Sequence, residues 1–203
     1  HRDLHSFPTR RSSDLEVPLK FNPRFETAGK EYHYILPIDP EKTLNFSLIQ
    51  SALEIMKGTH NFRLLAKKDR SKQENSTNST ITRSELHIQE TFLKFIFEGK
   101  YFLWEQIRRM ITFLFDIGNG TKTLDDLSAC FLPENYLSKH PKKIKPSPAD
   151  GLTLIKFHFS EPIEFIYEEK AVKRMKKCLE KHFVAQSQQA GATLSILQKA
   201  RGH

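Results

Sequence analysis

Residues 99–120, GKYFLWEQIRRMITFLFDIGNG, carry the clearest structural signal in the chain. At about 100° per residue, five apolar side chains of this stretch fall on one face of a helix. They are Leu103, Ile107, Met110, Ile111 and Leu114. Gly118 and Gly120 then end the periodicity. The stretch predicts a helix over residues 101–117 that is buried along one stripe.

Two adjacent arginines in this stretch have different surroundings. Arg109 follows Glu105 by four residues, a spacing worth roughly 0.3–0.5 kcal/mol in a helix, so we interpret the two as a surface ion pair. Arg108 instead has Trp104 and Thr112 four residues away. Its charge is expected either to reach solvent past the Trp104 ring or to meet an acid from outside the helix.

The composition is that of a soluble, basic protein. The 203 residues are 38% hydrophobic, and 32 basic against 24 acidic residues give a net charge of +8. No apolar run approaches the roughly 20 residues that cross a bilayer, and no signal peptide is present. We expect a soluble protein without membrane contact, cytoplasmic, or nuclear if the source is eukaryotic. Cys130 and Cys178 lack ligand or disulfide spacing, so no metal site is expected.

Three clusters of basic side chains favour a polyanionic partner, because neutralising phosphates releases counterions. The clusters lie within residues 67–72, 139–145 and 173–181. Interleaved with aromatic strands they fit RNA, although each cluster by itself is more often a solvated surface.

Residues 1–15, HRDLHSFPTRRSSDL, coincide without a mismatch with an in-frame translation of a common sequencing-library adapter. This resemblance implies a non-native segment, with native sequence starting near Glu16. The alternative is a genuine polar arm. Removing its three arginines and two aspartates lowers the net charge only from +8 to +7, so the basic character belongs to the remainder.

The remainder alternates strand-like and helical patterns. Strands are expected at residues 30–36, 84–89, 92–97 and 152–159, and helices at 46–56, 101–117, 124–131 and 168–183. Thr123 is the expected N-cap of the third helix. Without a strict strand–helix–strand order, the pattern predicts an α+β fold, with a mostly antiparallel mixed sheet and helices packed on one face. Residues 16–183 would form this domain, and 184–203 a polar tail, disordered or weakly helical.

Common catalytic signatures are missing from the sequence. There is no GxGxxG, Walker lysine loop, GxSxG or HExxH, which argues against most cofactor enzymes. Tyr32 and Tyr34 share one face of a predicted strand that follows Lys30, a pattern able to stack a base and hold its phosphate. Two tyrosines at strand spacing are by themselves more often a packing pair.

Five blocks, in order and sensibly spaced over residues 21–159, resemble the tRNA pseudouridine synthase A family, nearest its archaeal and eukaryotic branches. They are RFETAGKEYHYIL, MKGTHNF, NSTITRSELHI, GKYFLWEQIRRMITFLFDIGNG and ADGLTLIKFHF. The resemblance implies an α+β synthase core that uses no metal or organic cofactor. It also implies isomerisation of uridine to pseudouridine in the anticodon arm of tRNA, in the class of positions 38–40. The partner is then tRNA, and homodimers are usual in the family.

The resemblance also implies roles for individual residues. In the family, an aspartate of an Arg-Thr-Asp motif attacks a uridine that has been flipped out of the stem, or its sugar. Arg108 matches the arginine that keeps this carboxylate ionised and in place, and Tyr32 the tyrosine that stacks on the flipped base. RNA contacts are expected from Lys30, Tyr34, His60, Arg83 and Arg109. His60 has the alternative of a turn or core histidine, and Glu105 departs from the His that relatives commonly carry.

The nucleophile has no counterpart here, because no Arg-Thr-Asp triplet occurs in the 203 residues and Asp14 lies in the adapter-like segment. Family order places the aspartate upstream of Phe21. We therefore expect a C-terminal part of a synthase that is inactive as given. The alternatives are a non-catalytic RNA-binding module of the same ancestry, or an unrelated basic scaffold that binds proteins.

Overall fold

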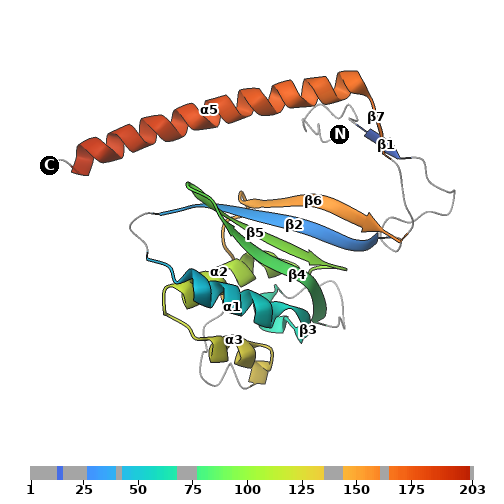
Figure 1. The fold of residues 1–203 in the computed structure, drawn as a ribbon, viewed down its shortest axis with the longest axis vertical. Helices are drawn as coiled ribbons and strands as arrows, with labels where there is room; N and C mark the ends of the chain where they lie inside the picture. Colours follow the sequence, from blue (N-terminus) through green and yellow to red (C-terminus); the bar gives the residue numbers. More distant parts are fainter. Residues whose placement is uncertain are drawn as a thin grey trace, which may run out of the picture. The chain divides into compact units, whose positions relative to one another are not determined.

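The computed structural model describes residues 13–15, 27–39, 43–67, 77–134, 144–160 and 165–201 (Figure 1). The chain divides into two compact units. One comprises Asn22–Ser160, and the other combines His1–Phe21 with Glu161–His203.

The larger unit is built on a five-stranded sheet with the order β3-β4-β5-β2-β6, in which all neighbours are antiparallel. Its strands are β2 (Thr27–Pro37), β3 (Gly58–Asn61), β4 (Asn78–Ile88), β5 (Phe92–Gly99) and β6 (Leu152–Phe159). Four of the five were predicted from alternation. The short β3 was not, because Gly-Thr-His-Asn contains no apolar alternation.

Three helices lie on one face of this sheet, as predicted for the α+β fold (Figure 1). They are α1 (Phe46–Met56), α2 (Gln106–Gly118) and α3 (Leu124–Cys130). The Asn45 side chain accepts the Leu48 N–H at 3.0 Å and begins α1. Thr123 caps α3 as predicted and forms a reciprocal capping box with Asp126.

Helix α2 begins five residues later than the periodicity predicted. Glu105 has a left-handed backbone with φ 60°, which an α-helix cannot include. The buried Gln106 side chain accepts the Leu103 N–H at 2.7 Å and so fixes the turn that enters the helix. The sequence pattern continued through this turn because Leu103 still packs against the core.

The core fills the space between the sheet and the helices. The apolar stripe of α2 is confirmed, since Ile107, Met110, Ile111 and Leu114 are all buried. Phe95 and Phe97 of β5 are also fully buried. Each such side chain contributes roughly 1.5–3 kcal/mol relative to its exposed state, so this layer holds α2 firmly on the sheet.

In the smaller unit, β1 (Ser13–Leu15) pairs antiparallel with β7 (Phe165–Tyr167), and α5 (Glu169–Arg201) follows. Residues 13–15 of the adapter-like segment are thus in a strand, while residues 1–12 lie outside the described part. Helix α5 extends beyond the predicted end at residue 183 and continues through residues 184–201, for which the sequence left a disordered or a weakly helical tail open. Those residues include no proline, and several Ala, Gln and Leu residues there favour helix. The described helices contain no stretch suited to spanning a membrane.

Candidate active site around Arg108

Arg108 faces the segment 144–150, which leads into β6. Its Nε donates to the Ser147 carbonyl at 2.6 Å, and the Ser147 N–H donates back to the Arg108 carbonyl at 3.0 Å. Among the described residues, no carboxylate lies within ion-pair distance of this guanidinium and no acceptor engages its terminal nitrogens. The side chain is partly buried and held by one nitrogen. The remaining nitrogens keep the fork geometry that binds a carboxylate.

Tyr34 of β2 lies beside Arg108. It is fully buried, and its hydroxyl donates to the Pro148 carbonyl at 2.8 Å. Burial raises the pKa of Tyr34, while the Ser147 side chain and the Arg108 charge act in the opposite direction. Contrary to expectation, Tyr34 has no exposed surface for an RNA contact. It instead holds the segment that receives Arg108.

The segment 144–150 is fixed by α2 on one side and by β2 on the other. The hydroxyls of Ser147 and Thr112 lie 2.9 Å apart, and the Ile35 N–H donates to the Gly151 carbonyl at 2.9 Å. A Cβ at Gly151 would lie 2.4 Å from the Ile35 carbonyl oxygen, so only glycine allows this approach. The position of Arg108 therefore depends on contacts between segments that are distant in sequence.

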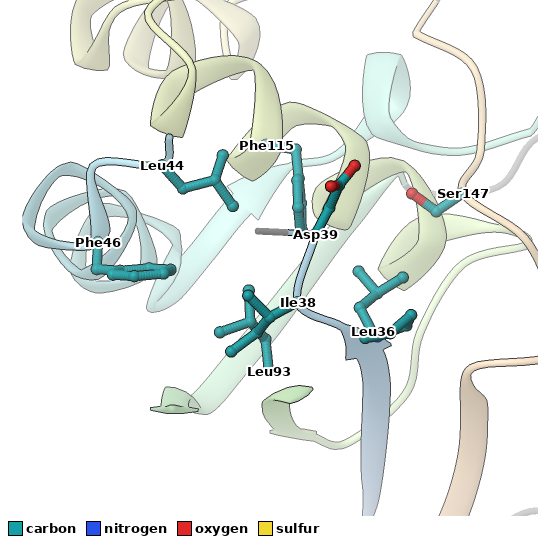
Figure 2. Close-up of a pocket in the computed structure, with 9 residues that line it drawn as sticks. Leu36, Ile38, Asp39, Leu44, Phe46, Leu93, Phe115 and Ser147 are labelled. Atoms are coloured by element: carbon teal, nitrogen blue, oxygen red, sulfur yellow. The ribbon is translucent and has the colours of Figure 1, made fainter. Parts of the chain in front are cut away.

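A pocket of about 380 Å³ lies at the C-terminal end of β2, next to this segment (Figure 2). Most of its lining is apolar and includes Leu36, Leu93 and Phe115. Ser147 also lines it, so one residue contacts both the pocket and Arg108. In Figure 2, Ser147 and Asp39 carry the polar groups among the labelled side chains.

Tyr32 lies two positions from Tyr34 on the same face of β2 and is partly buried. Its ring meets Phe102 edge to face, with centroids 5.4 Å apart and an interplanar angle of 86°. Burial raises the pKa of Tyr32. Nearby, the Lys30 Nζ lies 5.7 Å from the centroid of the Phe157 ring. Unlike Tyr34, Tyr32 retains surface with which to meet a ligand.

Arg109 forms the predicted pair with Glu105, but the pair is not on the surface. The two side chains are only 13% and 14% exposed. Arg109 Nε donates to Glu105 at 3.1 Å and its Nη1 donates to the Ile144 carbonyl. The hydrogen bond from Arg109 lowers the pKa of Glu105. Because the segment 144–150 covers it, Arg109 is engaged within the protein rather than presented to RNA.

The alternative in which Arg108 stacks on Trp104 is wrong. The cation over the Trp104 ring is Lys67, whose Nζ lies 4.0 Å from the ring centroid. Lys67 also lies 3.8 Å from Glu105. Arg108 Nε donates to the Ser147 carbonyl instead.

Arg83 lies on the opposite face of the sheet from Arg108. Its neighbour Ser84 is buried on the helix side, where its hydroxyl donates to the Leu53 carbonyl at 2.7 Å. Strand alternation therefore directs Arg83 away from the helices. Its Nε and Nη2 each donate to Glu85 at 2.7 Å, and bonds from Arg83 and His87 lower the pKa of Glu85 to about 2. The structure does not bring Arg83 to the Arg108 site.

His60 takes part in a turn and in packing. Its Nε2 lies 2.7 Å from the Lys57 carbonyl oxygen. Its ring stacks on Phe131, with centroids 4.2 Å apart and an interplanar angle of 17°. These contacts match the turn histidine that the sequence left as an alternative.

Three side chains in the described part of the chain lie close enough together to bind one metal ion: Glu31, Glu98 and His158. However, Glu31 already accepts from His33 at 2.7 Å and pairs with Arg83 at 3.9 Å. We interpret the group as part of an ion-pair network on the face of the sheet opposite the helices, away from Arg108.

Comparison with known proteins identifies a matching family. Residues 52–160, more than half of the chain, match the family model described as tRNA pseudouridine synthase. The chain belongs to this family. The family predicted from the five sequence blocks is therefore confirmed. Arg108, Ser147 and Gly151 lie within the matched residues 52–160. Tyr32 and Tyr34 precede them.

Several archaeal relatives are named tRNA pseudouridine synthase A. The chain is 33% identical to that of Methanosarcina barkeri (strain Fusaro / DSM 804) over 159 residues, which cover 78% of this chain and 55% of the relative. It is 28% identical to that of Methanosphaera stadtmanae over 186 residues, 91% and 65% of the two lengths. For Pyrococcus abyssi the identity is 31%, covering 84% and 61%. The chain thus spans between about half and two thirds of these synthases.

The sequence did not indicate Ser147 and Pro148 as part of the Arg108 site, and it marked Thr112 only as a helical neighbour of Arg108. They act through a hydroxyl and backbone carbonyls, which no side-chain motif marks. The one signal was Gly151 at the start of a predicted strand, since glycine there indicates a close backbone approach.

Proposed function

We propose that this chain is the part of a tRNA pseudouridine synthase that supplies the arginine and tyrosine of the active site. The proposal is carried by the partly buried Arg108 guanidinium, which is held by one nitrogen and has no carboxylate within ion-pair distance among the described residues. A fixed cation of this kind is costly to bury without an anionic partner. The substrate is proposed to be tRNA, with uridines of the anticodon arm as targets.

The reaction needs a carboxylate nucleophile, which we propose comes from a segment outside this sequence. The carboxylate forms a bond to the flipped-out uridine or its sugar, and the bond from the sugar to base N1 breaks. The sugar then bonds to C5 of the base, the bond to the carboxylate breaks, C5 loses its proton to solvent and N1 takes up a proton. The proton gained balances the proton lost, so the reaction is an isomerisation. Arg108, at ion-pair distance, would lower the carboxylate pKa by about 1–3 units and keep it charged at neutral pH.

The two tyrosines have different roles in this proposal. Tyr34 positions the segment 144–150 through Pro148 and so orients Arg108. Tyr32, partly buried and braced at its edge by Phe102, is the residue we propose to stack on the flipped base. Aromatic stacking of this kind is worth about 1–3 kcal/mol per base.

The basic surface supports a polyanionic substrate, given the net charge of +8. Binding of tRNA should weaken steeply as salt rises, because phosphate contacts release counterions. We further propose that the complete enzyme is a homodimer and that the 203-residue chain alone binds tRNA without turnover. The competing candidate, a non-catalytic RNA-binding module, is favoured by one observation, the missing Arg-Thr-Asp triplet.

The test is Arg108→Met in the complete enzyme that contains this sequence. Turnover should fall by at least about 100-fold while tRNA affinity stays nearly unchanged, because the arginine acts on the carboxylate and in the transition state. Turnover is measured by release of tritium from 5-tritiated uridine in tRNA, and affinity by filter binding. Lys57→Met is the charge-matched control, since the Lys57 side chain is 37% exposed and pairs with Glu54 among the residues that the structure describes. Normal turnover in Arg108→Met would refute the assignment, and absence of turnover in the unaltered complete enzyme would favour the binding module.

A further inference from the structure

Trp104 is the only tryptophan of the chain and lies exposed in the turn before α2. Its side chain is 56% exposed. Tryptophan is highly buried on average, because its large ring gains the most from leaving water. Among the described residues no acceptor engages its indole N–H. Its exposure therefore calls for an explanation beyond folding.

The turn that presents Trp104 is held by several contacts. The Lys67 N–H donates to the Trp104 carbonyl at 2.8 Å, while the Lys67 ammonium lies 4.0 Å from the ring centroid and 3.8 Å from Glu105. Glu105, in turn, is bound by Arg109. Glu105 keeps a left-handed backbone that is unfavourable for a residue other than glycine. The Trp104 ring is thus exposed on a turn that several contacts hold in place.

The same turn adjoins the Arg108 site. The charge of Arg108 reaches Glu105, whose pKa it helps to lower after the larger effects of Arg109 and Lys67. The Lys67 ammonium thus contacts both the Trp104 ring and Glu105, and Arg108 lies within electrostatic reach of the same Glu105. Nucleic-acid sites for unpaired nucleotides combine these groups, with aromatic rings that stack bases and cations that meet phosphates.

We propose that Trp104 is a stacking platform for an unpaired nucleobase of the RNA substrate, with Lys67 contacting the adjoining phosphate. The proposal rests on the proposed function and adds a second base-binding position to it, distinct from the stack on Tyr32. The positive charge of Lys67 beside the ring favours a phosphate-bearing ligand over a neutral apolar peptide. Lys67 contacts one face of the ring, and the exposed remainder of the ring is available to a base.

The single tryptophan makes the proposal directly measurable, because intrinsic tryptophan fluorescence of the chain reports on Trp104 alone. The 203-residue chain is titrated with tRNA while Trp104 emission and the anisotropy of labelled tRNA are both followed. Stacking should quench the emission along the same isotherm as binding. An inorganic polyphosphate, which carries charge but no bases, should compete for binding without quenching. Lys67→Met should still be quenched and should lower the salt dependence by about one phosphate contact.

Variants of Trp104 distinguish the contribution of base stacking to tRNA affinity from the contribution of charge. Trp104→Leu should weaken tRNA binding by about 5- to 150-fold, the range for loss of one stacked base, and Trp104→Phe should restore most of the affinity. Phe183→Leu, at an aromatic residue of α5 that is 71% exposed, is the matched control and should bind as the unaltered chain does. Circular dichroism checks that each variant is folded.

Two failures are distinguishable. Binding of tRNA by anisotropy with unchanged Trp104 emission, or with full affinity in Trp104→Leu, would overturn the platform and leave the synthase proposal standing. Absence of tRNA binding in the unaltered chain would contradict both the stacking platform and the proposal that this chain binds tRNA. Quenching by a neutral apolar peptide but not by RNA would identify the ring as a protein contact instead.

Discussion

At the scale of single residues, the site depends on hydrogen bonds to backbone carbonyls. Arg108 is oriented by Ser147, and Ser147 belongs to a segment that Tyr34 holds through Pro148. Neighbouring tyrosines on one strand face therefore differ in role, because Tyr34 is fully buried while Tyr32 keeps exposed surface. Residue type and spacing are the same for both, and only depth within the protein separates them.

Tyr34→Phe should destabilise the protein by about 0.5–1.5 kcal/mol, because the partly buried hydrogen bond from the Tyr34 hydroxyl to the Pro148 carbonyl is lost. The free energy of unfolding from urea denaturation measures the change. Tyr101→Phe is the matched control, since its hydroxyl donates to the Asn78 carbonyl at an exposed site where water can substitute. An equal loss in the two variants would show that burial does not determine the contribution of Tyr34.

At the scale of elements, the site is the junction of α2 with the start of β6. Gly151 permits this junction by letting β6 begin against the Ile35 carbonyl. The buried side chains of α2 fix the position of this helix over the sheet, and with it the position of Arg108. The packing of α2 and β6 thus determines where Arg108 lies, although the Arg108 side chain itself makes few contacts.

Gly151→Ala should cost about 1–3 kcal/mol of folding free energy and displace Tyr34. The added Cβ would lie 2.4 Å from backbone oxygen and 3.2 Å from two Tyr34 ring carbons, and the backbone cannot yield cheaply. Thermal unfolding measures the stability. Gly29→Ala in the same pair of strands is the control, because its Cβ would meet nothing closer than 3.6 Å. Equal stability of the two variants would contradict the close approach.

At the scale of the whole molecule, the hydrophobic core lies within one unit. Among the described residues, all of its members, including the partly buried residues packed on it, fall between Tyr32 and Leu152. The unit Asn22–Ser160 also contains every residue proposed for the site.

A polypeptide of residues 22–160 should therefore unfold cooperatively with a Tm within a few degrees of that of the full chain. Differential scanning calorimetry compares the two. A second truncation to residues 22–150 removes β6, which pairs with β2 along its length, and should lower the Tm markedly or abolish the transition. If residues 22–160 fail to fold while the full chain folds, the two units are not independent.

The sequence by itself determined the local elements and the family. The apolar periods of 3.6 residues in helices and 2 residues in strands depend only on neighbours within a few residues. For this reason the bounds of α1 and β6 match the prediction, and the buried stripe of α2 is confirmed. The five ordered blocks identified the family that the comparison then showed. Local patterns do not encode a left-handed residue such as Glu105, so the start of α2 was placed too early.

Only the tertiary structure decided which side chains meet. Arg108 and Ser147 are 39 residues apart, and their contact arises from the packing of α2 against the segment that enters β6. Arg83 and Arg108 look alike in sequence, yet strand alternation and helix packing direct them to opposite faces of the sheet. A charge pattern records which groups a chain carries, whereas depth and the partners brought by distant segments determine which of those groups remain free to act.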